Sequence, residues 1–588
     1  MSRCLTALRV GNFKAFADTQ RIPLKPITLI FGPNSAGKSS FIHSLALAHE
    51  AQFGRDKRSL ARLDVHHTEI GGISIDLGGF RQYVHRGQAN RRVEWGAELA
   101  VASFDGRLAQ LLAPVSTVTV MLSLGIELDD QDRPKPGAEP KVEAINISAD
   151  GAELLHMSRR RSDAHGSLLR LDRLDAAHPV FRQVLKAIVE SATTSEEMRP
   201  EDFEGANAAI ADLLPELQVR IEQLFPTVVE LPKAEGAELS PVSLLFLISK
   251  GNRREDIAQA VRFYLPRTIN DLVKGLSDAL ADELKCLQYL GPLRSFPPRH
   301  LAFAEYEDAN WYAGGGYAWD VVRCDDQVRE VVNSWLGSSK LQTRYKLVVR
   351  SLAAVDQLQE PIANALESIP TDALGLKAKF FDEQEPVSVD DGTYLTRPDI
   401  SHLVESIYPE IRDTEVATEH LVRALDGSNL EALRELVLID QRTNTVVTHR
   451  DVGIGISQVL PVLVMAYGSQ GKLIAMEQPE VHLHPALQAE LGDVFIEAAL
   501  GERQNTFILE THSEHLILRL MRRMRETYLH KDTGLPPVTP ADVSILYVEP
   551  DGPRSIVREM LLNELGELVK SWPGGFFEES LREQFGDA

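Results

Sequence analysis

Cysteine and long apolar runs are both scarce in this sequence. Its three cysteines, Cys4, Cys286 and Cys324, are far apart and form no C-x-x-C pair. This spacing argues against a disulfide scaffold or a cysteine-based zinc site and is typical of a reducing compartment, so we expect a cytoplasmic protein. No apolar run approaches the ~18 residues that a membrane-spanning helix needs, and the first residues do not resemble a signal peptide. We therefore expect no membrane association.

Basic residues are also in deficit. The 588 residues include 62 Lys and Arg against 85 Asp and Glu, which gives a formal net charge of −23. This balance argues against a uniformly basic surface for nucleic acid, although it leaves a local basic groove open. The candidates are Arg159–Arg161 and a cluster of four arginines, for which a solvated loop and a solvated helix face are the simpler interpretations. That cluster comprises Arg519, Arg522, Arg523 and Arg525.

What the sequence does contain is a glycine-rich loop between an apolar strand pattern and a helix pattern. The loop matches G-x-x-x-x-G-K-[ST], the phosphate loop of nucleotide-binding proteins. Its backbone N–H groups and the helix N-terminus offer hydrogen bonds and partial positive charge to phosphates. We predict that Lys38 contacts the β- and γ-phosphates and that the Ser39 hydroxyl binds Mg²⁺. The predicted nucleotide-binding residues are Gly32, Pro33, Asn34, Ser35, Ala36, Gly37, Lys38, Ser39 and Ser40.

A second group of polar residues follows an apolar strand pattern late in the chain. Glu477 stands at the carboxyl end of that strand, where an acid beside the phosphate-loop strand can hold Mg²⁺ through water. Gln478 cannot act as a general base at neutral pH but can orient water, and Glu480 is a nearby carboxylate that offers the base function instead. Which of these two positions the water stays open. His482 and His484 with Glu480 could be mistaken for a zinc site, but the H-E-x-x-H spacing is absent, so we do not expect zinc.

A third strand pattern, Thr506 to Glu510, ends just before His512. A histidine at such a strand end can sense a γ-phosphate and polarise water, although a lone histidine is more often structural. Upstream, a glycine-rich turn opens an apolar helix, which is another anion-binding geometry. Because the chain already has its own phosphate loop, we predict that this turn contacts the nucleotide of a second copy, a tight packing turn being the alternative. Its predicted binding residues are Gly453, Gly455 and Ser457.

The order of these patterns predicts an α/β fold with four regions. Residues 1–103 carry strand patterns and the phosphate loop, and residues 286–535 carry the remaining site motifs. Between them, residues 104–285 are expected to form a mostly helical insertion with some strands. Its helical patterns cover 180–192, 206–224, 254–264 and 268–284. Residues 536–588 are expected to form a short C-terminal domain that opens with a β-hairpin.

In this order the motifs resemble the ATP-binding-cassette (ABC) class of ATPases, in the soluble branch that contains the SMC and RecF proteins. The run Pro479–Pro485 is similar to a motif of the AAA-type ATPases that include the overcoming-lysogenization-defect family. Tyr289–Arg294 resembles another motif of that subgroup, and Ser571–Glu578 resembles a short C-terminal domain of unknown function attached to some members. The resemblance implies an ABC-type P-loop ATPase with an N-terminal β subdomain, a mixed central sheet, and ATP and Mg²⁺ as ligands.

The resemblance also implies a homodimer, or a higher oligomer, that assembles through its ATP-bound faces. Similar ATPases are components of bacterial antiphage defence systems, often paired with a nuclease such as an HNH protein, so we expect a separate effector protein. The sequence departs from the class where Gly453 replaces the usual signature serine and where Glu477-Gln478 replaces the usual Asp-Glu pair. We therefore expect slow hydrolysis. A DNA-repair ATPase that acts on nucleic acid and a scaffold that does not hydrolyse ATP remain the alternatives.

Overall fold

The computed structural model describes residues 3–54, 67–136, 138–159, 168–193, 199–230, 253–295, 308, 310–337, 340–341, 343–354, 394–395, 423, 433–447, 454–570 and 572–573. The chain forms two units. The first contains Met1–Ser295, Ala309–Gly315 and Met465–Ala588, and the second contains Phe296–Asp308 and Gly316–Val464. All predicted site residues fall in the first unit except those of the glycine-rich turn.

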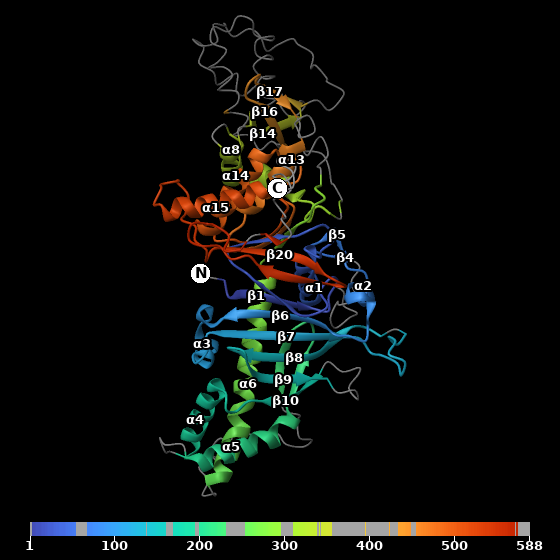
Figure 1. Ribbon diagram of the computed structural model, residues 1–588, viewed down its shortest axis with the longest axis vertical. Coiled ribbons are helices and arrows are strands. Elements are labelled where there is room, and N and C mark those ends of the chain that lie inside the picture. Colours follow the sequence, from blue (N-terminus) through green and yellow to red (C-terminus); the bar gives the residue numbers. More distant parts are fainter. Residues whose placement is uncertain are drawn as a thin grey trace, which may run out of the picture. The chain divides into compact units, whose positions relative to one another are not determined.

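A nine-stranded antiparallel sheet forms a large part of the first unit (Figure 1). Its strand order is β12-β11-β10-β9-β8-β7-β6-β1-β2. Alternate residues of its longer strands are buried, as expected when one face of a sheet packs on the core. The strands are β1 (Leu5–Gly11), β2 (Gln20–Pro23), β6 (Val93–Ala100), β7 (Thr117–Gly125), β8 (Lys141–Ala149), β9 (Ala152–Ser158), β10 (Leu168–Leu174), β11 (Gln218–Ile221) and β12 (Pro226–Glu230).

The segment 104–285 contains more helical than strand residues, as predicted, but its strands do not form a separate insertion. Six of its strands, β7 to β12, continue the sheet of β6, β1 and β2, and β7 pairs with β6 across the predicted boundary at residue 103. The helical pattern predicted at 206–224 ends at Leu213 because Pro215 lacks an N–H donor and restricts the residue before it. The helices of this segment are α3 (Gly106–Leu112), α4 (Pro179–Thr193), α5 (Pro200–Leu213) and α6 (Arg253–Lys285).

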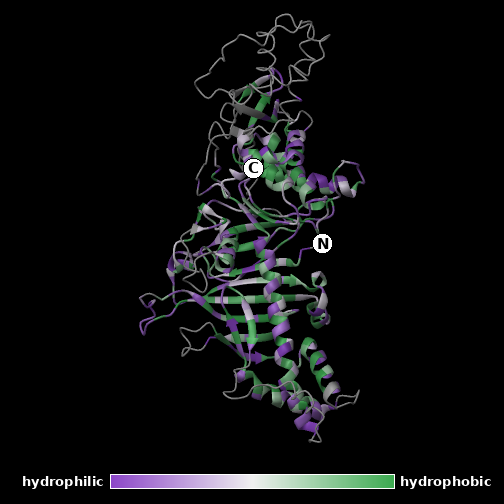
Figure 2. Cartoon of the chain, turned by 180° about the vertical axis from the view of Figure 1, so that it is seen from behind, coloured by the Kyte–Doolittle hydropathy of each residue, from purple (hydrophilic) through white to green (hydrophobic). Residues whose placement is uncertain are grey.

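Helix α6 is one continuous helix where the sequence predicts two. Pro266 lies inside it, and the Thr268 hydroxyl donates to the Tyr264 carbonyl oxygen over 3.1 Å next to that position. The helix runs along the nine-stranded sheet, and its buried residues, such as Leu272 and Leu276, join the core of the first unit (Figure 2). The apolar contacts of this face outweigh the hydrogen bond lost at Pro266.

A second, six-stranded sheet has the order β13-β18-β19-β3-β20-β21. The first five strands are parallel, and β21 pairs antiparallel with β20. The carboxyl ends of the parallel strands therefore share one edge, where open α/β sheets bind their ligands. The strands are β3 (Ile27–Phe31), β13 (Leu287–Leu290), β18 (Leu473–Glu477), β19 (Thr506–Glu510), β20 (Val543–Asp551) and β21 (Arg554–Glu559).

Strand order corrects one detail of the sequence prediction. The strand that ends at Glu477 is β18, and it is not the neighbour of the phosphate-loop strand β3, because β19 lies between them. The immediate neighbours of β3 are β19 and β20. Chain order alone does not determine which of several parallel strands are adjacent in a sheet.

The C-terminal residues also pack with the six-stranded sheet that contains the phosphate-loop strand. The predicted β-hairpin is present as β20 and β21, but β20 pairs with β3 and so forms part of the six-stranded sheet. Trp572 packs edge-on against Phe31, with ring centroids 5.6 Å apart, and against Tyr547. Strand β20 and Trp572 therefore contact the phosphate-loop strand, whereas residues 571 and 574–588 lie outside the described residues.

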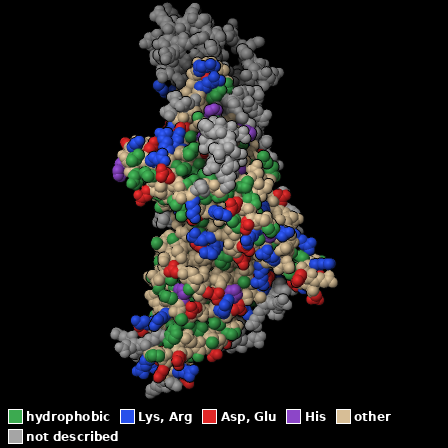
Figure 3. All heavy atoms as spheres, in the orientation of Figure 1, with side chains coloured by type: hydrophobic (Ala, Val, Ile, Leu, Met, Phe, Trp, Pro, Cys, Tyr) green, Lys and Arg blue, Asp and Glu red, His purple; other side chains and the backbone are tan. Residues whose placement is uncertain are grey.

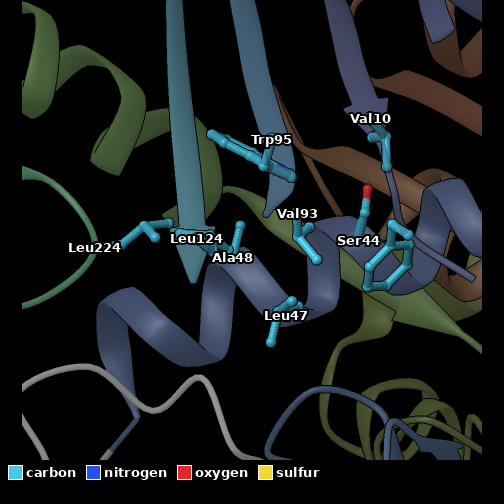
Figure 4. Close-up of a pocket in the computed structure, with 9 residues that line it drawn as sticks. Val10, Ser44, Leu47, Ala48, Val93, Trp95, Leu124 and Leu224 are labelled. Carbon is cyan, nitrogen blue, oxygen red and sulfur yellow. The ribbon is translucent and has the colours of Figure 1, made fainter. Parts of the chain in front are cut away.

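Helix α1 (Ser39–Phe53) packs on the antiparallel sheet. Figure 4 shows a small pocket where Leu47 and Ala48 of α1 meet Val93 of β6 and Leu124 of β7. The lining is apolar apart from the Trp95 indole nitrogen and the Ser44 hydroxyl, which donates to the carbonyl oxygen of the preceding turn over 2.7 Å. The lining side chains belong to the core, and their packing holds the helix that follows the phosphate loop in place.

The arginine cluster proposed as a basic patch is paired with acids. Arg519 and Arg523 of α15 (Glu514–Tyr528) both contact Asp493 of α14 (Pro485–Leu500), over 2.7 and 2.5 Å. Arg522 pairs with Glu526 and Arg525 with Glu567. Acidic and basic side chains are mixed on the surface shown in Figure 3. Arg519 and Arg523 therefore join α14 to α15 as largely buried ion pairs, so the cluster is neither a free basic patch nor wholly the solvated helix face that was the simpler interpretation, which describes only Arg522 and Arg525.

The second unit contains a four-stranded sheet of order β15-β14-β16-β17. Helix α8 is capped by the Asp325 carboxylate, which accepts two main-chain N–H groups, and Asn333 of α8 exchanges two hydrogen bonds with the main chain of Leu347 in β14. The elements are α7 (Tyr317–Cys324), α8 (Asp326–Leu336), β14 (Tyr345–Ala354), β15 (Tyr394–Leu395), β16 (Leu433–Asp440), β17 (Thr445–Val447) and α13 (Ile454–Tyr467), which ends in the first unit.

The remaining elements of the first unit are short. They are β4 (His67–Thr68), β5 (Gly72–Asp76), α2 (Phe80–Tyr83) and the 3₁₀ turns His85–Gly87, Val101–Ser103 and Leu214–Glu216. Among the described residues, no helix combines the length and apolarity that crossing a membrane requires.

Candidate nucleotide-binding site

The phosphate loop connects β3 to α1, as predicted. Two of its positions require glycine. Gly32 has φ of 145°, and a Cβ there would lie 2.1 Å from the carbonyl oxygen of Val548 in β20. Gly37 has φ of 97°, and a Cβ there would lie 2.4 Å from the Ala15 side chain. Left-handed backbone and close neighbours exclude larger residues at both positions, so the loop N–H groups can line a space suited to phosphate.

Lys38 lies over the loop that precedes it. Its Nζ donates to the carbonyl oxygens of Gly32 and Pro33 over 3.0 and 2.9 Å, and only 4% of the residue is exposed. Burial lowers the pKa of Lys38, and the charge of Glu510 opposes that shift. A buried cation held at a helix N-terminus by weak carbonyl partners is well placed to bind an anion such as a phosphate.

Two carboxylates stand side by side at the sheet edge. Glu477 ends β18, Glu510 ends β19, and the two residues are paired in register. The Ser39 side chain interacts with the Glu510 carboxylate. Burial raises the pKa of Glu510 to about 7, the negative charge of Glu477 adds to the increase, and Ser39 and Lys38 oppose it. The structure therefore adds to the predicted site an acid that the sequence analysis did not select.

The Glu477 side chain has partners from two other parts of the chain. The Tyr289 hydroxyl of β13 donates to Glu477 Oε1 over 3.0 Å, and His43 Nε2 of α1 lies 3.3 Å from the same oxygen. The other ring nitrogen of His43 contacts Lys14 Nζ, and burial lowers the pKa of Lys14 to about 8. Cationic and hydroxyl groups thus surround Glu477, although the sequence patterns gave no reason to select His43 or Lys14.

Glu480 and His512 are brought together by the main chain. The His512 N–H donates to Glu480 Oε1 over 2.7 Å. Burial raises the pKa of Glu480 and lowers that of His512, where the charge of Lys38 acts in the same direction. Arg294 lies beside them and donates to the Glu477 carbonyl oxygen over 3.5 Å, and burial lowers its pKa to about 10. Glu480 therefore positions the strand end that carries His512.

The residues after Glu477 form a tight turn. Gln478 has φ of 48°, and its N–H donates to the Glu510 carbonyl oxygen over 2.7 Å. His482 is exposed, and His484 caps α14 by accepting the Ala486 N–H over 3.3 Å. Within the described part of the chain, no group of three or more His, Cys, Asp or Glu side chains is arranged to hold a metal ion.

The glycine-rich turn is only partly described. Gly455 and Ser457 lie in the first turn of α13, which begins at Ile454, and Ser457 is buried. Gly453 lies outside the described residues. A glycine-containing first turn of an apolar helix agrees with the predicted local structure, and the contact with the nucleotide of a second copy stays a prediction.

The donor set fits Mg²⁺ bound together with a nucleotide. Mg²⁺ prefers oxygen ligands and is usually bound through one or two carboxylates plus phosphates and water, without a complete protein cage. Ser39 with Glu477 or Glu510 supplies such oxygens at the edge where Lys38 and the loop can meet phosphate.

Two stretches of the chain match known protein families. Residues 351–519 match the family described as "AAA domain, putative AbiEii toxin, Type IV TA system", and residues 7–130 match the family described as "AAA domain". No curated protein matches the chain significantly. The Smc head domain with an extended coiled coil bound to the C-terminal domain of ScpA, from Pyrococcus furiosus, is similar at 11% identity, covering 95% of this chain and 96% of that chain, with a TM-score of 0.32. The SMC head domain from Thermotoga maritima is similar at 9% identity, covering 95% and 99%, with a TM-score of 0.29.

These structural scores are too low to support a conclusion, so the class follows from the other observations. The order of the parallel strands, the phosphate loop between β3 and α1, and the two AAA-domain matches are those of a P-loop ATPase fold. The two matched stretches are of the AAA-domain type. This confirms the predicted α/β P-loop fold class and the AAA-type resemblance, and the resemblance to ATPases of antiphage defence stays a prediction.

Proposed function

We propose that this protein binds ATP with Mg²⁺, hydrolyses it slowly, dimerises around it and thereby controls a separate effector. The observation that supports the proposal most directly is the placement of Lys38 over the phosphate loop, facing the strand-end carboxylates. The loop N–H groups and Lys38 would hold the phosphates. Ser39 and Glu477 would hold Mg²⁺, which when bound neutralises charge on the phosphates.

Gln478 is the reason to expect slow turnover. An amide orients water but does not accept its proton, and Glu480 is buried with one oxygen bonded to the His512 N–H. We expect Gln478→Glu to raise the steady-state turnover number about tenfold or more, since a positioned general base typically contributes at least that much. Glu477→Gln should lower turnover, and Gln478→Ala and Glu480→Gln separate the two candidates for positioning water.

Gln478 also favours a second function, that of a nucleotide-dependent scaffold that does not hydrolyse ATP. Wild-type protein that binds ATP tightly but releases no phosphate above the rate of Lys38→Ala would support the scaffold. If Glu477→Gln and Glu480→Gln both turn over like the wild type, the assigned site is incorrect.

Dimerisation rests on the helix start at Gly455 and Ser457. In the ATPases that the sequence resembles, this turn completes the site of a partner copy, and two-fold symmetry then makes two such sites. Light scattering should show a doubled mass with a non-hydrolysable ATP analogue and a monomer without it. Gly455→Arg should remove the mass change and keep ATP binding, whereas the exposed control Ser334→Arg should keep both. A mass that ignores nucleotide in the wild type contradicts the dimer.

Control of an effector is supported by the name of the matched family, which refers to a toxin system. We propose a nuclease, such as an HNH protein, in bacterial antiphage defence as that effector. Phage plating on cells that carry the chain with its neighbouring genes should show protection, which Lys38→Ala removes and Lys472→Ala at the opposite end of β18 retains. Equal protection by the wild type and Lys38→Ala would contradict ATP-dependent control.

A further inference from the structure

We infer that Glu510 is a second carboxylate of the magnesium site, which orients the Ser39 hydroxyl and supports the cation alongside Glu477. This inference rests on the proposed function and names a residue for the same site. Three observations carry it: the interaction of Ser39 with Glu510, the register of the two strand ends, and a buried carboxylate oxygen of Glu510 without a partner among the described residues.

The first observation concerns the hydroxyl that follows Lys38. In P-loop ATPases this hydroxyl binds Mg²⁺ through its oxygen, so its hydrogen needs an acceptor that a nearby acid can provide. Here the nearby acid is Glu510, which interacts with Ser39. Glu477 instead accepts the Tyr289 hydroxyl and contacts His43 through the same oxygen. The acid in contact with the phosphate-loop serine is therefore Glu510.

The second observation is the strand order. β19 lies directly beside β3, so Glu510 stands one strand closer to the phosphate loop than Glu477 does. Residues in register on parallel neighbours project to the same face of a sheet, which places both carboxylates at one position. The turn after β18 strengthens this arrangement, because the Gln478 N–H donates to the Glu510 carbonyl oxygen over 2.7 Å.

The third observation is the burial of the Glu510 carboxylate. Glu510 is 6% exposed, and its Oε2 has no hydrogen-bond partner among the described residues. A buried carboxylate oxygen without a partner costs free energy, which a bound cation or its water shell would relieve. Two carboxylates, one hydroxyl, phosphate oxygens and water make a complete ligand set for Mg²⁺.

The test separates binding of nucleotide from binding of the cation. A fluorescent ATP analogue is titrated in EDTA and then at increasing MgCl₂, and Mn²⁺ binding to the protein–nucleotide complex is followed by electron paramagnetic resonance. Glu510→Gln should bind the analogue in EDTA at least as tightly as the wild type. The Mg²⁺ concentration for half-maximal effect should rise about 10- to 100-fold, the usual loss when a supporting ligand is removed.

Two further variants make the outcome decisive. Glu502→Gln makes the same charge change at an exposed position in the turn between α14 and β19 and should match the wild type throughout. Lys38→Ala tests the proposed function itself, because it should lose the analogue even in EDTA. A Glu510→Gln variant that binds the analogue normally and retains the wild-type Mg²⁺ and Mn²⁺ dependence overturns the role of Glu510. Loss of binding in EDTA with unchanged cation dependence would make Glu510 a structural residue only and would also overturn it.

Discussion

Replacing Asp493 by alanine should loosen the helix pair that carries the end of the site. Asp493 is buried and accepts hydrogen bonds from Arg519 and Arg523, both of which are less than one-fifth exposed. Helix α15 begins directly after His512, so this ion cluster also fixes the histidine strand end. Removing the acid would leave two buried guanidinium groups with one partner each, Glu490 and Glu526.

The magnitude follows from the remaining partners. Removing one member of a buried ion pair usually costs about 3–5 kcal/mol, and the two surviving acids reduce this to about 2–4 kcal/mol. Native-state hydrogen exchange of the α14 and α15 amides should therefore become about 30- to 1000-fold faster, because exchange reports the free energy of local opening. Arg522→Ala removes an exposed pair on the same helix and should change exchange by less than about fivefold. Unchanged exchange in Asp493→Ala, or an equal effect of Arg522→Ala, would refute the structural role of the cluster.

Two further predictions concern stability. The hydrogen bond from Arg253 holds the pKa of Asp202 at about 2, below its ordinary value of 3.8, so this contribution is present above pH ~4 and is lost as pH falls through about 2. Asp202→Asn should therefore lower the unfolding temperature near neutral pH, with a difference from the wild type that shrinks towards pH ~2; a difference independent of pH would contradict this. Gly32→Ala should lose both stability and ATP affinity because of the Val548 carbonyl, whereas Gly552→Ala, with φ of 60° and open space, should cost only about 1–2 kcal/mol in an unfolding titration. Equal losses in the two variants would argue against the close contact at Gly32.

Local patterns were sufficient for the elements that carry the site. The fully apolar strand 27–31, the glycine-rich loop and the following helix are where the sequence predicts them, because each is determined by residues near one another in the chain. The same holds for the strands that end at Glu477 and Glu510. A continuous apolar run followed by polar residues is typical of a buried parallel strand and its functional end.

Features that depend on pairing between distant parts of the chain are harder to predict from the sequence. Strands β11 and β12 have four and five residues, and their short patterns after a helix resemble its continuation. The sequence alone does not single out Glu510, because the role of this residue depends on β19 being the neighbour of β3, which no local pattern reveals. The signal for this residue in the sequence is an acid at the end of the strand that precedes His512. His43 and Tyr289 acquire their role only when α1 and β13 meet at Glu477.

Calorimetric titration of the protein with ATP and Mg²⁺ tests the central claim most directly. The wild type should bind one ATP per chain. Lys38→Ala should lose about 3–6 kcal/mol, which is two charge-assisted hydrogen bonds and about 10²- to 10⁴-fold in affinity. Lys472→Ala should bind like the wild type. Wild-type affinity in Lys38→Ala, with both proteins folded, would contradict the assignment of Gly32–Ser39 as the phosphate site.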